Sequence, residues 1–221
     1  MALIENNNNA STKYLKIADF SICEKYSTEQ PGWAVLKTKD STGKEYTSWI
    51  KRYRGVEGII TGIEFVTRIL PGTNGTKVSS WKITLSDNGE KYSLDIPSTS
   101  PAASRFVKLA ENIDPTQPVE ISAWKDTSEA KPKLAFMVKQ NGANIPQKYT
   151  VKDNVLVDYA NSDWADAPKL KIRANGQKDW SAIEDFLFER MTNVVTPRFT
   201  DVVVEHEESG NSDNVSDDLP F

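Results

Sequence analysis

The sequence predicts a mainly β fold, because short β-rich runs separated by turn residues fill residues 32 to about 140. A single helical pattern interrupts these runs, and helix is otherwise scarce in this stretch. The spacing of the runs suits a small antiparallel barrel, in which each strand is joined to the next by a tight turn.

Five strand-like runs precede the helix. They cover residues 33–37, 46–53, 59–70, 78–85 and 92–96. The connecting segments 39–43, 71–75 and 87–89 contain Gly or Asn, the residues that accept the positive φ angles of tight turns. The pattern therefore predicts a series of hairpins.

A helix is predicted to start after Ser100, a good N-cap residue that is followed at once by a proline. Apolar residues such as Ala103 and Phe106 recur in it at helical spacing. Two more strands are predicted at residues 119–124 and 134–138. Strands, then a helix, then two strands is the order of the OB-fold, a five-stranded Greek-key barrel, so we expect an OB-fold with extra hairpin strands.

The chain is expected to divide into four segments. These are a flexible, Asn-rich N-terminal arm at 1–12, an OB-fold nucleic-acid-binding domain at 13–150, a loop-rich extension with a C-terminal helix at 151–196, and a disordered acidic tail at 197–221. Within the extension, residues 155–159 suit a strand and residues 180–191 have helical spacing of apolar side chains. The helix is expected to end before Pro197.

Charge is distributed unevenly along the chain. The net charge is −4, but residues 201–221 hold seven of the 31 acidic residues and none of the 27 basic residues, so the rest has a charge of +3. A basic body with an acidic tail is typical of a protein that contacts nucleic acid while limiting its own affinity, although a merely solubilising tail has the same composition.

The chain has no apolar leader and no long apolar run, so we expect neither export nor membrane insertion. The single cysteine, Cys23, cannot form an internal disulfide, which suits a reducing cytoplasm and a small buried side chain.

The composition argues against an enzyme. The only histidine, His206, lies in the acidic tail, so a histidine-based catalytic site or a zinc site lacks its usual ligands. The acidic stretch 158–166 lacks the ligand spacing of a calcium loop, and residues 72–77 lack the Gly spacing of a phosphate loop. We therefore expect no catalytic residues, no metal and no cofactor.

Single-stranded nucleic acid is held by aromatic rings that stack on bases and by cations that follow the backbone. Strand parity identifies candidates for such a surface. Trp49, Lys51 and Tyr53 alternate on one face of the strand at 46–53, and Arg52 and Arg54 flank them. This strand is the best candidate, because a strand buried on both faces would not place Lys between two rings.

Further candidates lie on neighbouring strands. Trp124 and Lys125 are expected on the polar face of the strand at 119–124. Lys133 and Lys139 are expected to point outward beside Met137 on the next strand. Trp33 alternates with Lys37 on the first strand, where the burial of the indole is ambiguous. Second-tier candidates are Arg68, Lys82 and Lys91, whereas Trp81 and Tyr92 are expected in the core. For every candidate, packing of the ring under a loop or solvation of the charge is the structural alternative.

The last five residues are Asp217, Asp218, Leu219, Pro220 and Phe221. They resemble the acidic tip of bacterial single-stranded-DNA-binding proteins. The resemblance implies that Phe221 fills an apolar pocket of a replication or recombination protein, while its own carboxylate and the two aspartates meet a basic rim.

The run 56–63, the strand around 81–87 and the helix at 101–113 also resemble single-stranded-DNA-binding proteins of tailed bacteriophages. Together these resemblances imply sequence-independent single-stranded DNA binding in replication, recombination and repair, in the cytoplasm of a bacterial host. A homo-oligomer stays open, because the chain lacks the long linker of the bacterial proteins and carries an added C-terminal segment. The alternatives are a phage structural or assembly protein acting through protein contacts only, and an RNA-binding OB protein.

Overall fold

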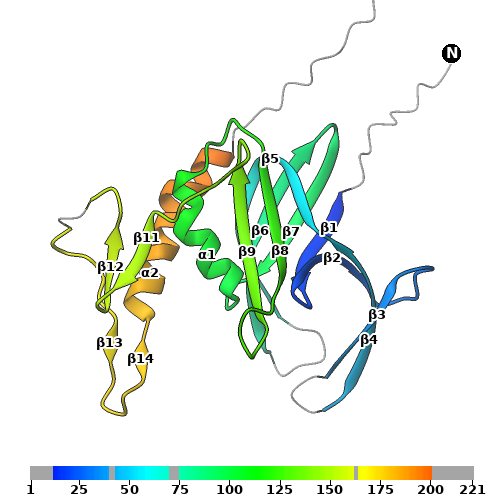
Figure 1. Ribbon diagram of the computed structural model, residues 1–221, viewed down its shortest axis with the longest axis horizontal. Helices are drawn as coiled ribbons and strands as arrows, with labels where there is room; N and C mark the ends of the chain where they lie inside the picture. The colour runs from blue at the N-terminus through cyan, green and yellow to red at the C-terminus, as the bar shows by residue number, and fades with distance from the viewer. Residues whose placement is uncertain (1–11, 40–42, 70–74, 162–163, 201–221) are drawn as a thin grey trace, which may run out of the picture.

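The computed structural model describes residues 12–39, 43–69, 75–161 and 164–200. These residues form a mainly β protein with two α-helices (Figure 1). The strands are β1 (Lys13–Ala18), β2 (Ser21–Tyr26), β3 (Ala34–Lys39), β4 (Glu45–Tyr53), β5 (Gly55–Ile69), β6 (Lys77–Asp87), β7 (Glu90–Pro97), β8 (Val119–Asp126), β9 (Lys133–Gln140), β10 (Ala143–Asn144), β11 (Tyr149–Lys152), β12 (Val155–Asp158), β13 (Lys171–Ile172) and β14 (Lys178–Asp179). The helices are α1 (Pro101–Leu109) and α2 (Ser181–Arg190), each of which continues into further helical turns.

The first ten strands make one sheet in the order β10-β9-β8-β5-β6-β7-β1-β2-β4-β3. The only parallel pair among them joins β1 to β7. The sheet ends at β10 and β3, so the described ladders do not close it into a barrel. The predicted five-stranded barrel is therefore corrected to an open, mainly β sheet, in which β2 lies close to β8 without ladder pairing between them.

Strand β5 is long and bent, and it joins strands β8 to β10 on one side of it to strand β6 and the strands beyond on the other. Its first residues pair with β8 and the remainder pairs with β6, with a register shift between Ile60 and Gly62. Gly58 has a φ of 154°, and a Cβ there would lie 2.7 Å from the backbone oxygen of Ser86. A glycine at this bend is required because β5 passes so close to β6.

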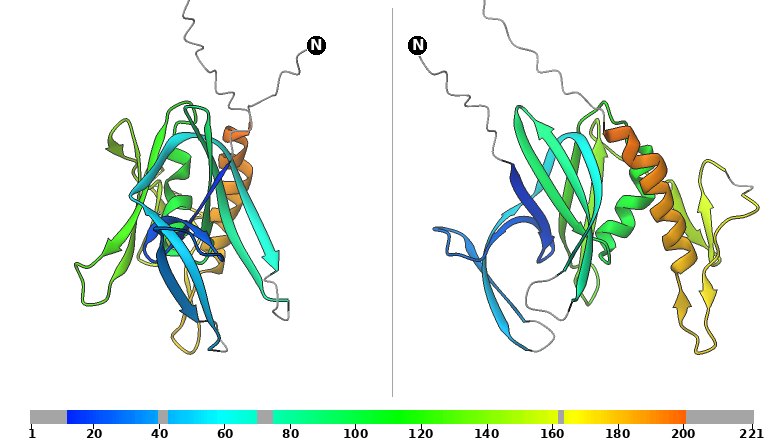
Figure 2. Two further views of the ribbon diagram at one scale, coloured as in Figure 1. Left: turned by 90° about the vertical axis from the view of Figure 1, so that its right-hand side faces the viewer. Right: turned by 180° about the vertical axis from the view of Figure 1, so that it is seen from behind.

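Most of the core lies between the inner face of the sheet and helix α1. Ser100 caps this helix by accepting a hydrogen bond from the Ala103 amide at 3.1 Å, as its position predicted. Phe106 and Leu109 on α1 are buried against inward residues of the strands, such as Ile83 and Phe136. Both helices lie on one flank of the sheet, and the β3–β4 hairpin projects from the opposite flank (Figures 1 and 2).

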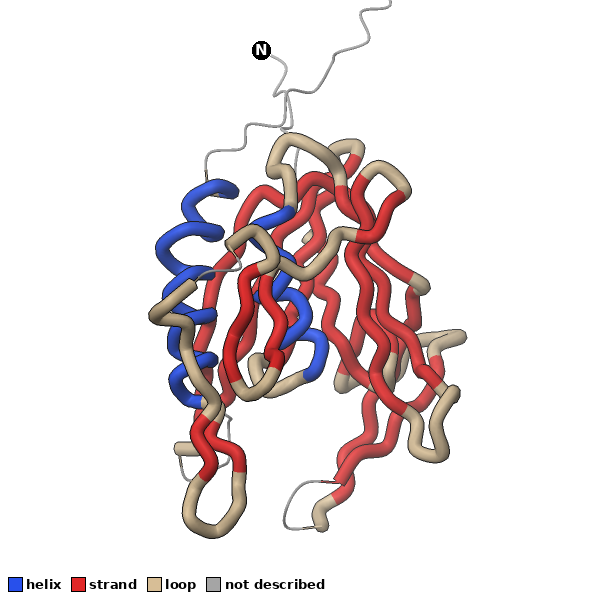
Figure 3. The backbone as a smooth tube through the Cα atoms, turned by 60° about the vertical axis from the view of Figure 1, so that its left-hand side comes forward, coloured by secondary structure: helices blue, strands red, loops and turns tan. Residues whose placement is uncertain are grey.

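The extension after β10 forms a small second cluster. Two short hairpins, β11–β12 and β13–β14, stand beside α2 (Figure 3). Tyr149, Leu156 and Leu187 are buried together there. The predicted loop-rich segment therefore has its own core, built around the strand and the helix that the sequence indicated.

A buried carboxylate ties this extension to α1. Glu111 accepts hydrogen bonds from Arg190 at 2.7 and 2.8 Å, from Lys148 at 2.6 Å and from Tyr149 at 2.6 Å. Arg198 adds hydrogen bonds to the backbone oxygens of Glu111 and Ile113. Burial raises the pKa of Glu111, but the hydrogen bonds from Arg190, Lys148 and Tyr149 outweigh burial and lower it to about 2.

The helical segment runs past its predicted end. After α2 it continues through Met191–Val195 and Thr196–Phe199, with Pro197 in the first turn of the last piece, where a missing amide costs little. Phe199 is fully buried in the main core. The tail boundary predicted at 197 is therefore too early, because residues 197–199 belong to the folded body.

The other predicted elements agree with the structure within a few residues, and Cys23 is buried as expected. The sequence did not predict the hairpin of β1 and β2. This hairpin turns at Asp19 and Phe20, both with positive φ, rather than at Gly or Asn.

Candidate nucleic-acid interface

Strands β2, β3 and β4 bring several predicted residues onto one face. Trp49 on β4 lies opposite Tyr26 on β2 and Val35 on β3. Opposite residues in antiparallel strands point to the same side, so these three side chains are neighbours. We call this surface the hairpin face and define it by Tyr26, Trp33, Val35, Lys37, Trp49, Lys51 and Tyr53.

The rings of the hairpin face are accessible to different degrees. Tyr26 is 48% exposed, whereas Trp33 and Trp49 are half-buried. The ring centroids of Tyr26 and Trp33 are 5.2 Å apart in an edge-to-face arrangement. This packing fixes the orientation of Trp33 and leaves polarisable ring surface beside Trp49.

The lysines of this face form no ion pair within the described residues, although Glu24 lies opposite Lys51 on the neighbouring strand and accepts a hydrogen bond from Tyr53. Among the described residues, Lys37 and Lys51 form no ion pair, and the Lys51 ammonium lies 5.5 Å from the centroid of the Tyr53 ring. An unpaired lysine can contact a phosphate without first breaking an internal ion pair.

Tyr53 anchors the base of the hairpin face to the protein body. Its hydroxyl donates a hydrogen bond to Glu24 at 2.6 Å, and its ring packs against the main core. Burial and the hydrogen bond to the Glu24 carboxylate both raise the pKa of Tyr53, so the phenol stays neutral.

Arg52 lies on the opposite side of β4. It pairs across the sheet with Cys23, and its guanidinium forms an ion pair with Asp19. Arg52 therefore does not share the surface of Trp49 and Lys51.

A second surface lies on the outer side of β8 and β9. Arg54, Trp124, Met137 and Lys139 line a hollow of about 310 Å³ together with Glu120, and Trp124 is 44% exposed. We call this surface the β8–β9 face. Arg54 forms no ion pair in the described part of the chain, so this hollow combines an accessible indole with an available guanidinium.

The lysines of β8 and β9 differ in availability. Lys139 pairs with Glu120 at 3.7 Å, and Lys133 pairs with Glu129 at 2.5 Å. Lys125 points to the side opposite Trp124, and its ammonium lies 5.8 Å from the centroid of the Phe20 ring. The prediction that grouped Lys125 with Trp124 is corrected, because adjacent residues of a strand point to opposite faces.

The second-tier candidates neither belong to the hairpin face nor line the hollow of the β8–β9 face. Arg68 pairs with Asp95 and Lys82 with Glu64, each at 3.6 Å, and Lys91 lies opposite Ser86. Trp81 is buried, as predicted, whereas Tyr92 is half-buried and donates a hydrogen bond to Glu90.

Tyr26 is the aromatic residue of the hairpin face that the sequence did not single out. The omission follows from the unpredicted β1–β2 hairpin. The alternation of Tyr14 and Lys16 with Leu15 and Ile17 is the signal that could have indicated it.

The tail residues Asp217, Asp218, Leu219, Pro220 and Phe221, with His206, lie outside the described residues. In the described part of the chain, no group of three or more His, Cys, Asp or Glu side chains is arranged to hold a metal ion. None of its helices is long and apolar enough to span a membrane.

Neither a family model, a curated protein nor a solved structure matches this chain.

Proposed function

We propose that the protein binds single-stranded DNA without sequence preference, on the hairpin face and the adjoining β8–β9 face. The observation that carries this proposal is the grouping of Tyr26, Trp33 and Trp49 with Lys37 and Lys51 on one side of three paired strands. Every base has a ring surface that can stack on an aromatic side chain, so such binding tolerates any sequence.

The electrostatics supports the same proposal. Lys37, Lys51 and Arg54 form no ion pair among the described residues, so each is available to a phosphate. Arg54 directly follows Tyr53, the last residue of β4, which joins the two faces along the chain. A strand of nucleic acid that follows the β4–β5 junction would meet rings and cations from both.

The strand order supports an OB-fold assignment, which we also propose. Strands β5, β6 and β7, then α1, then β8 and β9 follow the chain order of that fold, and β8 lies beside β5 in the sheet. OB-folds are often only partly closed, and here β1 to β4 would be additions to the five strands. In this proposal the hairpin face belongs to the additions.

The C-terminal residues extend the proposal to partners. Asp217 to Phe221 would dock on replication, recombination or repair proteins of a bacterial cytoplasm infected by phage, through an apolar pocket with a basic rim. The protein itself would protect DNA and recruit partners rather than catalyse a reaction.

The experiment is a titration of fluorescein-labelled oligo(dT), followed by anisotropy and tryptophan quenching, from about 50 mM to about 200 mM salt. The test variant is K37A/K51A, and the control K171A/K178A removes two exposed lysines from the β13–β14 hairpin. We expect the test variant alone to lower the slope of log affinity against log salt by about 1.4, since a single-strand phosphate contact contributes about 0.7.

Two results would reject the proposal. The first is no binding of oligo(dT) at low salt. The second is an equal loss of affinity in both double variants, which would mean that net charge rather than the hairpin face drives the interaction. The same titration with oligo(U) measures the preference for DNA over RNA.

A further inference from the structure

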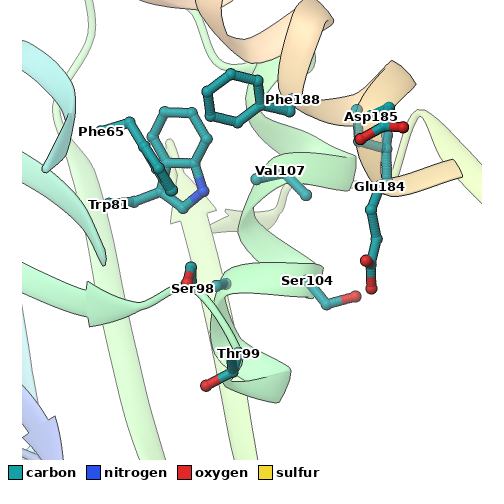
Figure 4. Close-up of a pocket in the computed structure, with 11 residues that line it drawn as sticks. Phe65, Trp81, Ser98, Thr99, Ser104, Val107, Glu184, Asp185 and Phe188 are labelled. Carbon is teal, nitrogen blue, oxygen red and sulfur yellow. The ribbon is translucent and has the colours of Figure 1, made fainter. Parts of the chain in front are cut away.

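A separate cleft lies between α2, α1 and the β5–β6 hairpin, on the helical flank of the sheet. Its volume is about 350 Å³, near the lower end of the roughly 300–1,000 Å³ typical of ligand pockets. Phe65, Trp81, Val107 and Phe188 form an apolar end, and Glu184 and Asp185 of α2 border the cleft (Figure 4). We call it the aromatic cleft and define it by these six residues.

The apolar end is a cluster of three rings. The Phe65 centroid lies 4.9 Å from those of both Trp81 and Phe188, and the Trp81 and Phe188 centroids are 5.8 Å apart. Trp81 is only 4% exposed, but Phe65 is 38% and Phe188 42% exposed. Two large apolar side chains thus meet at a hollow instead of in the core, which favours an apolar partner group there.

The border of the cleft is acidic. Glu184 and Asp185 are exposed, and neither forms an ion pair with a described Lys or Arg. Among the residues that the structure describes, no Lys or Arg lines the cleft. Figure 4 shows Glu184 extending toward Ser104 of α1, on the side of the cleft away from the rings. A ligand that lies across the cleft therefore meets rings at one end and an uncompensated carboxylate at the other.

We infer that the aromatic cleft binds a short segment of a partner protein in which a large apolar side chain stands next to Lys or Arg. The apolar side chain lies on Phe65 and Phe188, and the cation faces Glu184 and Asp185. The charge decides between occupants: DNA phosphates and the acidic tail of this chain are both repelled by the same carboxylates. The inference does not depend on the proposed DNA-binding function, since it concerns other residues.

The test uses three fluorescein-labelled peptides and the full-length chain. The first peptide, Gly-Ser-Phe-Arg-Leu-Lys-Ser-Gly, has the required chemistry. The second carries Glu in place of Arg and Lys, and the third carries Ser in place of Phe and Leu. We expect anisotropy to show binding of the first peptide alone. Hydrogen exchange of the protein with this peptide bound should show added amide protection in α2 and the β5–β6 hairpin.

Two variants separate the contributions of charge and rings. E184Q/D185N is expected to weaken binding of the first peptide by about tenfold, because it removes two exposed carboxylates that face the cation. The control E189Q/D166N neutralises two exposed acids outside the cleft and should leave the affinity unchanged. F188A should also weaken binding, and circular dichroism checks that each variant is folded.

The inference is overturned if none of the peptides binds, or if the acidic peptide binds as well as the basic one. It is also overturned if E184Q/D185N and E189Q/D166N weaken binding equally. A chain whose self-association is abolished by E184Q/D185N would show that a second copy occupies the cleft, which likewise contradicts a partner peptide.

Discussion

Replacing Glu111 by Gln removes the carboxylate that joins α1 to the C-terminal extension. Its side chain is 5% exposed and faces Arg190, Lys148 and Tyr149. The pKa falls from an ordinary value of 4.5 to about 2, a difference of about 2.5 units. At about 1.4 kcal/mol per unit, ionisation of this group stabilises the fold by about 3 kcal/mol near neutral pH.

The sign of the pH dependence follows from the lowered pKa. The stabilisation is fully present well above pH 4.5 and is lost as the pH falls toward the folded-state pKa of about 2. At pH 3 less than half of this stabilisation remains. Protonation of Glu111 in acid therefore removes the negative charge gradually, whereas the Gln substitution removes it at every pH.

The assay is urea unfolding of the original chain and of E111Q at pH 7 and at pH 3, followed by tryptophan fluorescence. We expect a difference in unfolding free energy of about 3 kcal/mol at pH 7 that shrinks by more than half at pH 3. E189Q, an exposed carboxylate next to Arg190 in sequence, should change stability by less than about 0.5 kcal/mol. A difference between E111Q and the original chain that is the same at both pH values would mean that ionisation of Glu111 does not stabilise the fold.

Two further predictions concern the C-terminal end of the last helical segment and the acidic tail. F199A should destabilise the protein by about 3–5 kcal/mol in the same unfolding assay, since Phe199 is fully buried; a loss below about 1 kcal/mol would mean that residues after Pro197 do not belong to the core. A chain that ends at Ser216 should unfold at the same urea concentration and bind oligo(dT) equally well or more tightly, because the removed aspartates compete with phosphates; weaker binding would contradict the proposed role of the tail.

Local patterns predicted most strands and both helices, because turn residues and side-chain periodicity are properties of neighbouring residues. The Ser100 cap and the alternation of Trp49, Lys51 and Tyr53 belong to this class. The β1–β2 hairpin was not predicted, because its turn at Asp19 and Phe20 contains neither Gly nor Asn.

Long-range features could not be predicted from local pattern. Closure of the sheet depends on which distant strands pair, and here the parallel pairing of β1 with β7 adds strands where a closing strand would lie in a barrel. The helical turn around Pro197 persists because Phe199 is buried by tertiary packing. The alternation of side chains along the strand predicted the face on which Trp49 lies. Only the pairing of β2 with β4 in the structure shows that Tyr26 lies opposite it.

The aromatic cleft is also a tertiary feature. Phe65, Trp81 and Phe188 come from β5, β6 and α2, and nothing in their local sequence indicates that they meet. Similarly, Glu111 reads in the sequence as an ordinary acid at the end of a helix, and only the structure brings Arg190 and Lys148 to it.

The most direct test of the proposed DNA-binding surface is the affinity of W49A for fluorescein-labelled oligo(dT), measured by anisotropy at low salt. Trp49 lies at the centre of the hairpin face, whereas Trp180 is an exposed tryptophan next to α2, so W180A is the matched control. We expect W49A to lose about 1–3 kcal/mol of binding free energy, roughly 5- to 150-fold in affinity, and W180A to bind like the original chain. An unchanged affinity of a correctly folded W49A would contradict base stacking on the hairpin face.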